Sequence, residues 1–293
     1  RRVEQHIVPE IGAIRIDRLQ PAQIEAWLER EAASGAAKKT IRDYRADLRE
    51  ALSWAQSRRV ITWNPATLAE LPASIRKSPE KRSFTSDEAS ALLTSLAGDG
   101  ERLGHYFTLL LLLGLRPGEA DALAWSDVDL EGQTLTVRRA MQRGDGGSPI
   151  AIGPTKTGKS RVLHLPDAVI GALRKQRVQQ SRERLVAGPG WSDDERWGDL
   201  VFTSQLGTPL HPSHNRRSFA RICKGAGVPQ LTPYELRHSA ASLLVAAGVP
   251  LHEIQDVLGH ADLRMLSETY RHSLNPVADG HVATMNSLTC AGD

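Results

Sequence analysis

Apolar residues recur at helical spacing through the first part of the chain, residues 1–71. A helix is predicted to begin at Pro21 and to end near Gly35, because apolar residues repeat every three or four positions between them. A longer amphipathic helix is predicted from Lys38 to Trp54. Its apolar stripe consists of Ile41, Tyr44, Leu48, Leu52 and Ala55. Residues 1–71 are therefore expected to form an all-helical domain.

A polar stretch with two prolines, residues 72–83, separates this domain from the rest of the chain. Its sequence, PASIRKSPEKR at 72–82, is typical of a linker. Thr85 and Glu88 then have the spacing of a capping box, in which each side chain accepts a hydrogen bond from the other residue's backbone N–H. We therefore expect a second domain over residues 84–293.

The second domain mixes helical and strand patterns. The apolar run Phe107–Leu113 must be buried, and it ends at Gly114. Residues 133–139 and 161–165 alternate as strands do, and they predict one small antiparallel sheet. Residues 166–185 return to helical spacing. The expected fold class is mainly α with a small antiparallel β-sheet.

The stretch 231–272 carries two further helices. Thr232 and Glu235 form another capping-box pattern, with Pro233 at the first helical position. The buried side of this helix is expected to consist of Leu236, Ala240, Leu243 and Ala247. A second short helix ends at Gly259, and its apolar side is expected to consist of Leu251, Ile254 and Leu258.

The composition is that of a globular protein with an uneven distribution of charge. Hydrophobic residues make up 40% of the 293 residues, and no apolar run is long enough to span a membrane. Cys223 and Cys290 form neither a disulfide framework nor a metal-ligand spacing, which fits a reducing cytoplasm. The net charge is +3, but residues 1–82 hold 16 Lys and Arg against 11 Asp and Glu. This excess indicates either an anionic partner such as nucleic acid or a solvated basic surface.

The basic residues of the helix at 38–54 are candidates for contacts with DNA phosphates. They lie on faces other than the apolar stripe and are Lys38, Lys39, Arg42, Arg45 and Arg49. The alternative is that arginines of this helix form surface ion pairs with Asp43 and Asp47. The sequence leaves both interpretations open.

Four residues suited to phosphoryl transfer occur in a recognisable order. Arg116 lies in LLLGLRPGEADAL, Lys156 in GPTKTGKSRVLHLP, Arg237 in LTPYELRH, and Tyr270 follows the LGH at 258–260 by ten residues. In this order they resemble the tyrosine recombinase (phage integrase) family. The N-terminal helical part, including TWNPA at 62–66, resembles that family's core-binding domain. The resemblance therefore covers essentially the whole chain.

Two arginines suit the chemistry that this resemblance implies. Cleavage of a phosphodiester places negative charge on the non-bridging oxygens, and two guanidinium groups can hold these oxygens without a metal. Arg116 and Arg237 lie far apart in the sequence, as a clamp that converges from two helices requires. Glu119 is expected to hold Arg116 or a backbone amide. The histidines show no metal-binding spacing, so no cofactor and no metal are expected.

The resemblance also implies roles for three further residues. Tyr270 would be the nucleophile that forms a 3′-phosphotyrosyl bond, and Lys156 would protonate the leaving 5′-oxygen. Lys159 competes with Lys156 for that role. His260 would hydrogen-bond the scissile phosphate.

One position departs from the family pattern. The family usually has H-x-x-R where this chain has Tyr234 three residues before Arg237. A phenol can donate a hydrogen bond to a phosphate oxygen, but it is a poor proton acceptor near neutral pH. We therefore expect Tyr234 to position the phosphate, on the same helix face as Arg237. His238 lies about 100° further around a helix and cannot simply substitute.

The resemblance implies a site-specific DNA recombinase, an integrase of a phage or integrative element. A helical core-binding domain and a mixed α/β catalytic domain would form a clamp on double-stranded DNA at core or attachment sites. The expected assembly is a homotetramer on DNA, and accessory DNA-bending or directionality proteins are further partners that the resemblance allows. The protein would be cytoplasmic, in the nucleoid, and encoded by a bacterium or phage. Two alternatives remain: a topoisomerase IB-like nicking and closing enzyme, or a DNA-binding module with impaired catalysis.

Overall fold

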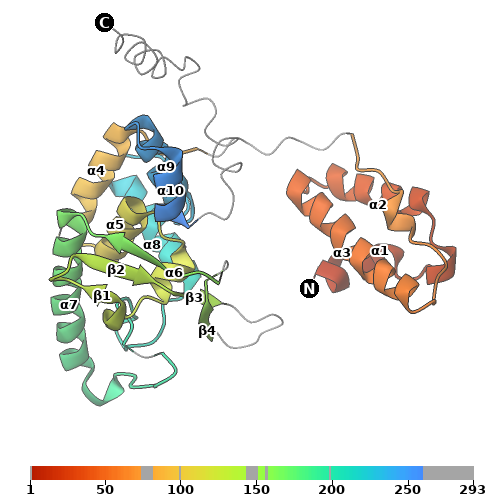
Figure 1. The fold of residues 1–293 in the computed structure, drawn as a ribbon. Helices are drawn as coiled ribbons and strands as arrows, with labels where there is room; N and C mark the ends of the chain where they lie inside the picture. The colour runs from red at the N-terminus through yellow and green to blue at the C-terminus, as the bar shows by residue number, and fades with distance from the viewer. Residues whose placement is uncertain are drawn as a thin grey trace, which may run out of the picture. The chain divides into compact units, whose positions relative to one another are not determined.

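The computed structural model describes residues 2–73, 82–98, 100–142, 151–155, 158–197 and 199–259. The chain divides into two compact units, Arg1–Glu80 and Lys81–Asp293. The described residues form mostly helices, with two small antiparallel sheets in the second unit (Figure 1). The expected fold class, mainly α with a small antiparallel sheet, is confirmed. The expected boundaries of 1–71, 72–83 and 84–293 stay a prediction, because most of the linker lies outside the described residues.

The first unit is all-helical where it is described. It contains a π-helical turn Val3–Ile7, α1 (Val8–Ile11), a 3₁₀ turn Ile16–Arg18, α2 (Pro21–Ala33), α3 (Lys38–Ser57) and a 3₁₀ turn Pro65–Thr67. The predicted apolar stripe of α3 is buried at all five positions, and it packs on Ile24, Trp27 and Leu28 of α2. Helical periodicity therefore predicted the contribution of α3 to the core, which also includes Ile7, Ile11, Leu19 and Ile61.

Asn64 fixes the segment that follows α3. Its side chain is buried, and its Nδ2 donates hydrogen bonds to the Arg49 carbonyl and to Ser53 Oγ, both at 2.9 Å. Its Oδ1 accepts from the Ala66 N–H at 3.0 Å. These bonds tie the TWNPA segment to α3, because each buried polar atom of Asn64 needs a partner.

Before its last described helix, the second unit contains six α-helices and five strands among the described residues. They are α4 (Ser86–Leu96), α5 (Gly104–Leu113), α6 (Pro117–Asp121), β1 (Val128–Asp129), β2 (Thr134–Val137), β3 (Arg139–Gln142), β4 (Ala151–Pro154), β5 (Arg161–His164), α7 (Asp167–Ala187), α8 (Pro212–Gly225) and α9 (Glu235–Ala246). The last described helix is α10 (Leu251–Leu258). The predicted capping box of Thr85 and Glu88 is present at the start of α4.

Helix α5 is the centre of this unit. It contacts α4, α6, α7 and α9, which explains why its sequence is apolar on almost every side. It ends at Gly114, whose φ of +59° lies in the left-handed region. A Cβ at this position would overlap the side chain of Leu258. Gly114 therefore lets the end of α10 approach the end of α5.

The strands form two sheets instead of the single sheet predicted. A three-stranded antiparallel sheet has the order β1-β2-β5, with Val137 opposite Arg161. A separate hairpin, β3-β4, lies between β2 and β5 in the sequence. The predicted strand 133–139 was therefore too long, since it ends at Val137 and residues 139–142 pair with β4. Strands β3 and β4 pair through backbone hydrogen bonds. Their side chains are partly exposed and do not alternate between buried and exposed, so the sequence did not predict them as strands.

Helix α9 differs from its prediction at both ends. It begins at Glu235 and not at Pro233, because the Glu235 N–H bonds to the Thr232 carbonyl instead of its hydroxyl. The other half of the capping box forms, since the Thr232 N–H donates to Glu235 Oε2 at 2.6 Å. Ala247 is exposed, contrary to the prediction, whereas Leu236 and Ala240 are buried as predicted. A second face of the helix, with Ala241 and Val245, packs against Ile254 and Leu258 of α10, which are buried as predicted.

Candidate active site

Arg116 caps the start of α6 and is held by Glu119. The backbone N–H of Arg116 donates to Glu119 Oε2 at 3.1 Å, and its Nη1 donates to Oε1 at 2.7 Å. Pro117 occupies the first helical position, where a missing N–H costs nothing. The side chain of Arg116 keeps 21% of its surface exposed. Glu119 thus holds Arg116, as the sequence predicted.

Glu119 is buried and pairs with a second arginine. Arg161, the first residue of β5, donates from Nη2 to Oε2 at 2.7 Å and from Nη1 to Oε1 at 3.2 Å. Burial opposes ionisation of Glu119, but the hydrogen bonds and charge of Arg161, together with Arg116, outweigh it and lower the pKa of this carboxyl. Glu119 is therefore a carboxylate shared by two guanidinium groups.

Arg237 lies in the first turn of α9 and is almost completely buried, with 2% of its surface exposed. Its Nη1 donates to the Gly114 carbonyl at 2.7 Å and its Nη2 to the Leu258 carbonyl at 2.6 Å. Burial, and then the positive charges of Arg116 and Arg161, lower the pKa of Arg237 to about 9. The guanidinium remains charged at neutral pH.

Three arginines bond to consecutive carbonyls at the end of α10. Arg161 Nε donates to Val257 at 2.9 Å, Arg237 Nη2 to Leu258 at 2.6 Å, and Arg116 Nη2 to Gly259 at 3.2 Å. The last carbonyls of a helix lack partners within the helix and carry partial negative charge, so cations are favourable there. We call Arg116, Arg161 and Arg237 the arginine cluster.

The arginine cluster brings together residues that are distant in the sequence. It joins α6, β5, α9 and the end of α10, so the predicted pair Arg116 and Arg237 does converge. Among the described residues, these three positive charges face one carboxylate, Glu119. The excess of positive charge and the remaining N–H donors suit the oxygens of a phosphate.

Sequence reasoning missed Arg161. A signal for it exists, because Arg161 and Leu163 are two residues apart on β5 and both turn inward, whereas Val162 between them is 62% exposed. A charged residue on the buried side of a strand requires a partner. That partner, Glu119, is 42 residues away in the sequence.

Tyr234 lies just before α9, beside the arginine cluster. It is 48% exposed, and its ring packs edge-on against His238 with 5.6 Å between the ring centroids. Tyr234 also lines a cavity of about 390 Å³ together with Pro117 and Gly118 of α6. Arg237, three residues on, is buried among backbone carbonyls instead. That Tyr234 and Arg237 share one phosphate stays a prediction.

Lys156, His260 and Tyr270 lie outside the described residues. Of the described residues on either side of Lys156, Thr155 donates from Oγ1 to the Lys159 carbonyl at 2.8 Å. In the sequence, His260 directly follows Gly259, whose carbonyl Arg116 holds. In the part of the chain that the structure describes, no group of three or more His, Cys, Asp or Glu side chains could hold a metal ion. No helix among the described residues is long and apolar enough to span a membrane.

Four of the five predicted DNA-contacting residues of α3, all except Lys38, fall into two groups. Lys39 forms an ion pair with Asp43 at 2.8 Å, and Arg2 pairs with Asp43 and Asp47. These pairs occupy the aspartates to which the alternative interpretation assigned the arginines of α3. Arg42, Arg45 and Arg49 line a shallow groove of about 550 Å³ and form no ion pair with any described residue.

Comparison with known proteins identifies the family. Residues 82–275 match the model of the phage integrase family. The chain is 31% identical to an integrase of Streptomyces ambofaciens, over 97% of this chain and 73% of that protein. It is 28% identical to a XerC-like tyrosine recombinase of Caldanaerobacter subterraneus, over 95% of this chain and 74% of that protein. The chain belongs to the phage integrase family of tyrosine recombinases, as the resemblance in its sequence indicated.

Solved structures of integrases share the fold. The Tn1549 transposon integrase in complex with a circular intermediate DNA matches with a TM-score of 0.78 at 22% identity, covering 98% of this chain and 90% of that one. A lambda integrase dimer bound to a core site matches with a TM-score of 0.64 at 19% identity, covering 91% and 84%. At these identities the likeness concerns the fold alone.

Proposed function

We propose that this protein is a site-specific DNA recombinase that cleaves and rejoins DNA through a covalent bond to Tyr270. The observation that carries the proposal is the convergence of Arg116 and Arg237 in one cluster with excess positive charge. Family membership supplies the reaction class, which is site-specific recombination. Its substrate is double-stranded DNA at the core or attachment sites of a phage or other mobile element.

The reaction conserves the number of phosphoester bonds. The Tyr270 hydroxyl loses its proton to water and its oxygen bonds to phosphorus, the bond from phosphorus to the 5′-oxygen breaks, and Lys156 gives a proton to that leaving oxygen. The 5′-hydroxyl of another strand reverses the step and regenerates Tyr270. Because the phosphotyrosyl link retains the bond energy, the reaction needs no ATP. Arg116 and Arg237 stabilise the charge on the non-bridging oxygens, so no metal is required for that task.

The remaining residues hold these groups in place. Glu119 and Arg161 fix Arg116 and the end of α10, and His260 follows that end and hydrogen-bonds the phosphate. Tyr234 donates a hydrogen bond to the phosphate without accepting a proton. Lys38, Lys39, Arg42, Arg45 and Arg49 of α3 contact the phosphate backbone of the duplex. Four copies of the chain assemble on two duplexes in the bacterial cytoplasm.

Strand transfer between two differently labelled duplexes tests this function. Both duplexes carry the recombination site of the element that encodes the chain. We expect products that join the two labels, without added metal or ATP. Nicking and resealing within single duplexes only would indicate a topoisomerase-like enzyme. DNA binding without any cleavage would indicate a module with impaired catalysis.

A further inference from the structure

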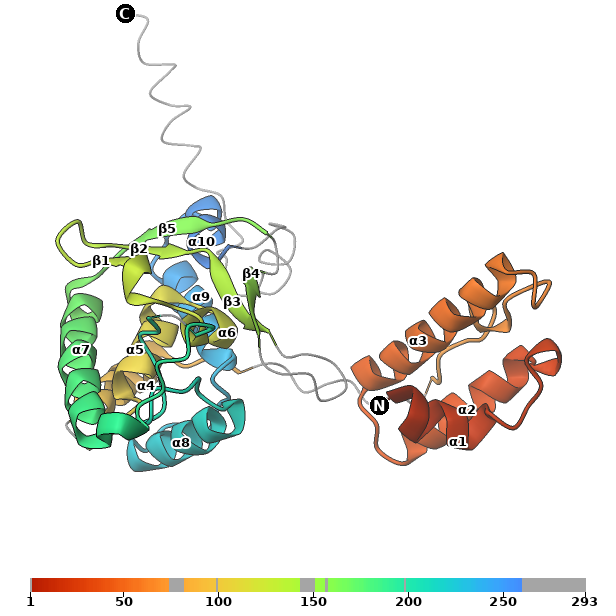
Figure 2. The same ribbon diagram turned by 90° about the horizontal axis from the view of Figure 1, so that it is seen from below.

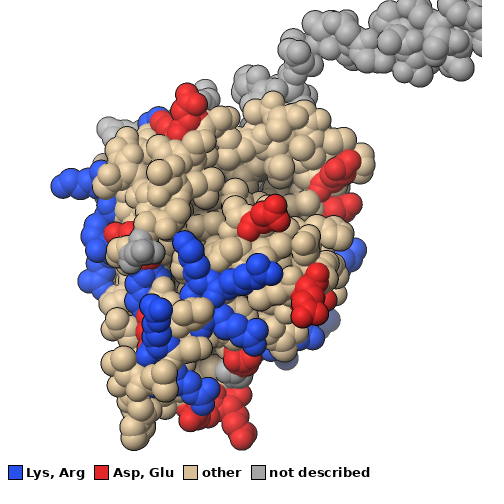
Figure 3. All heavy atoms as spheres, turned by 90° about the vertical axis from the view of Figure 1, so that its left-hand side faces the viewer, with Lys and Arg blue, Asp and Glu red and all other residues tan. Residues whose placement is uncertain are grey.

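A groove of about 750 Å³ runs between α7 and the start of α5, away from the arginine cluster. Three cations of α7 line it, Arg174, Lys175 and Arg182, and all three are exposed. We call it the α7 groove. Figure 3 shows Lys and Arg side chains gathered on this side of the second unit. In Figures 1 and 2, α7 lies at the edge of the unit opposite β3 and β4.

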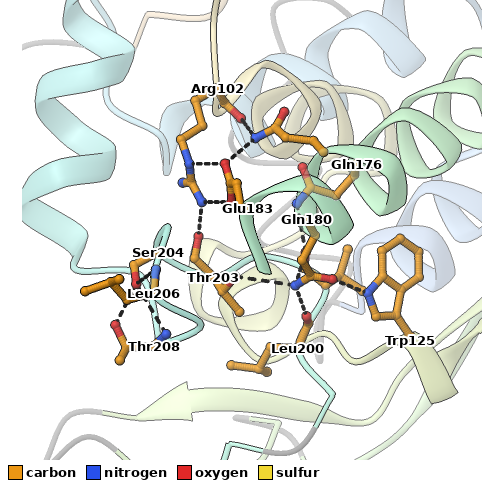
Figure 4. Close-up of polar contacts among 12 residues, drawn as sticks. Arg102, Trp125, Gln176, Gln180, Glu183, Leu200, Thr203, Ser204, Leu206 and Thr208 are labelled. Carbon is orange, nitrogen blue, oxygen red and sulfur yellow. Dashed lines mark hydrogen bonds and ion pairs between the residues drawn. The ribbon is translucent and has the colours of Figure 1, made fainter. Parts of the chain in front are cut away.

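The acidic residues of the α7 groove are already neutralised. Arg102 binds Glu183 through two hydrogen bonds of 2.7 Å and also donates to the Thr203 carbonyl at 2.8 Å (Figure 4). Glu101 pairs with Arg221 of α8 at 2.8 Å. The two carboxylates therefore do not compete for an anionic ligand. The network around Arg102 also fixes one wall of the groove before any ligand binds.

The three cations of α7 are available to a ligand. Arg174, Lys175 and Arg182 form no ion pair with any residue that the structure describes. Arg174 and Arg182 are eight residues apart on the helix, which separates their Cα atoms by about 12 Å along its axis. A row of positive charges with this spacing complements a polymer with regularly spaced negative charges.

We propose that the α7 groove binds the phosphate backbone of a second DNA segment, separate from the one held at the arginine cluster. The groove shares no lining residue with the cluster. Arginine recognises phosphate oxygens through paired donors, and two of the three available cations are arginines. The proposal rests on the proposed function, since recombination brings further duplex DNA next to the one being cleaved. An acidic protein is the competing ligand.

The test compares two double variants of α7 in the full chain. Arg174→Gln with Arg182→Gln removes two charges from the groove and leaves the Arg102–Glu183 pair intact. Arg177→Gln with Arg184→Gln is the matched control on another face of the same helix, where Arg177 lies over Trp125 and Arg184 pairs with Asp193. The measurement is the salt dependence of binding to a duplex limited to the recombination site and to a longer duplex that extends beyond it.

We call Arg174→Gln with Arg182→Gln the groove variant. We expect its binding to the long duplex, and not to the short one, to depend less on salt than that of the wild type. Each lost phosphate contact lowers the slope of log K against log salt by about 0.9, so two contacts lower it by about 1.8. Both variants should cleave the short duplex at the wild-type rate. An unchanged slope on the long duplex, an equal fall in the control, or a fall on the short duplex would each overturn the proposal.

A third ligand separates DNA from an acidic protein. Poly-L-glutamate offers regularly spaced carboxylates but no phosphates, and we expect the groove variant to bind it as the wild type does. Binding to poly-L-glutamate as tight as to DNA, and lost in the groove variant, would assign the groove to an acidic protein instead. A wild-type chain that binds both duplexes but never cleaves would contradict the proposed function and leave the groove measurement valid.

Discussion

At the scale of single residues, the site depends on how buried charges are balanced. Glu119 is the carboxylate between Arg116 and Arg161, and Arg237 is buried nearby, where it donates to the backbone carbonyls of Gly114 and Leu258. The like charges of the three arginines repel one another, and this repulsion adds to burial, the main cause of the lowered pKa of Arg237. An anion at this site would relieve that repulsion, which links phosphate binding to the stability of the cluster.

Removal of the Glu119 charge should destabilise the fold. Glu119→Gln keeps the shape but leaves three arginines without a carboxylate, and loss of one partner from a buried ion pair costs about 3–5 kcal/mol. The fold lowers the pKa of Glu119, so its stabilisation is present above the unfolded pKa of about 4.3 and is lost as the pH falls through the folded pKa. Denaturant unfolding should therefore show the difference from wild type at neutral pH and a smaller one below about pH 4.

Glu88→Gln is the control for this measurement. Glu88 pairs with Arg82 at the surface, where such a pair contributes less than about 1 kcal/mol. An equal loss of stability in both variants, or a Glu119 effect that does not depend on pH, would contradict the role assigned to the buried pair.

Arg161 should act on cleavage without acting on DNA affinity. Arg161→Met removes the donors to Glu119 and to the Val257 carbonyl, so Arg116 and α10 lose a common support. We expect a single-turnover cleavage rate lower by about tenfold, less than the 10²–10³ typical of a direct donor to the transition state. Arg161→Lys keeps the charge and should recover part of the rate. Equal cleavage rates for the wild type, Arg161→Met and Arg161→Lys would show that Arg161 has only a structural role.

Tyr234 should position the phosphate without taking a proton. Tyr234→Phe should slow cleavage by about 10²–10³-fold, the cost of one lost donor, without abolishing it. Tyr234→His should keep or raise activity and add a pH dependence near the histidine pKa of about 6.5. A Tyr234→Phe protein that cleaves at the wild-type rate would make this ring a packing partner of His238.

The sequence predicted the site only in part at this scale. Arg116 and Arg237 could be found because each lies in a local motif. Arg161 was missed because its partners are distant in the sequence. Glu119 and the Val257 carbonyl meet Arg161 only in the folded chain, and no local pattern predicts these contacts.

At the scale of elements, periodicity predicted the helices better than the strands. The stripe of α3 and the cap of α4 follow from local spacing, and both are confirmed. The β3-β4 hairpin was missed because its residues are half-exposed and its pairing depends on backbone hydrogen bonds. The start of α9 was misplaced by two residues because a turn competes with the helix there.

Helix α3 should contribute electrostatic, sequence-independent affinity for DNA. Arg42→Gln with Arg49→Gln removes two cations that form no ion pair with any described residue, and it should lower the salt slope by about 0.9 per lost contact for every duplex sequence. Arg15→Gln with Arg30→Gln is the matched control, because these arginines pair with Asp17 and Glu10. If the slope stays the same in the Arg42 and Arg49 variant, the surface of α3 does not contact DNA.

At the scale of the whole molecule, the two units differ in their chemistry. The first unit offers cations that form no ion pair with any described residue, and the second unit holds the arginine cluster. The uneven charge distribution and the order of the motifs in the sequence predict this difference. The sequence did not predict the α7 groove, because the groove is basic only where Glu183 and Glu101 are neutralised by arginines distant in the sequence.

The proposed mechanism requires that Tyr270 becomes covalently bound to DNA. Nicked suicide substrates, which trap the covalent intermediate, followed by peptide mapping of the adduct, measure this directly. We expect an adduct at Tyr270 that disappears in Tyr270→Phe, while DNA binding is retained. Tyr106 is an unsuitable nucleophile, because burial and then the charge of Asp121 raise its pKa well above the usual value. An adduct at Tyr106 or Tyr234, or one that persists in Tyr270→Phe, would contradict the proposed mechanism.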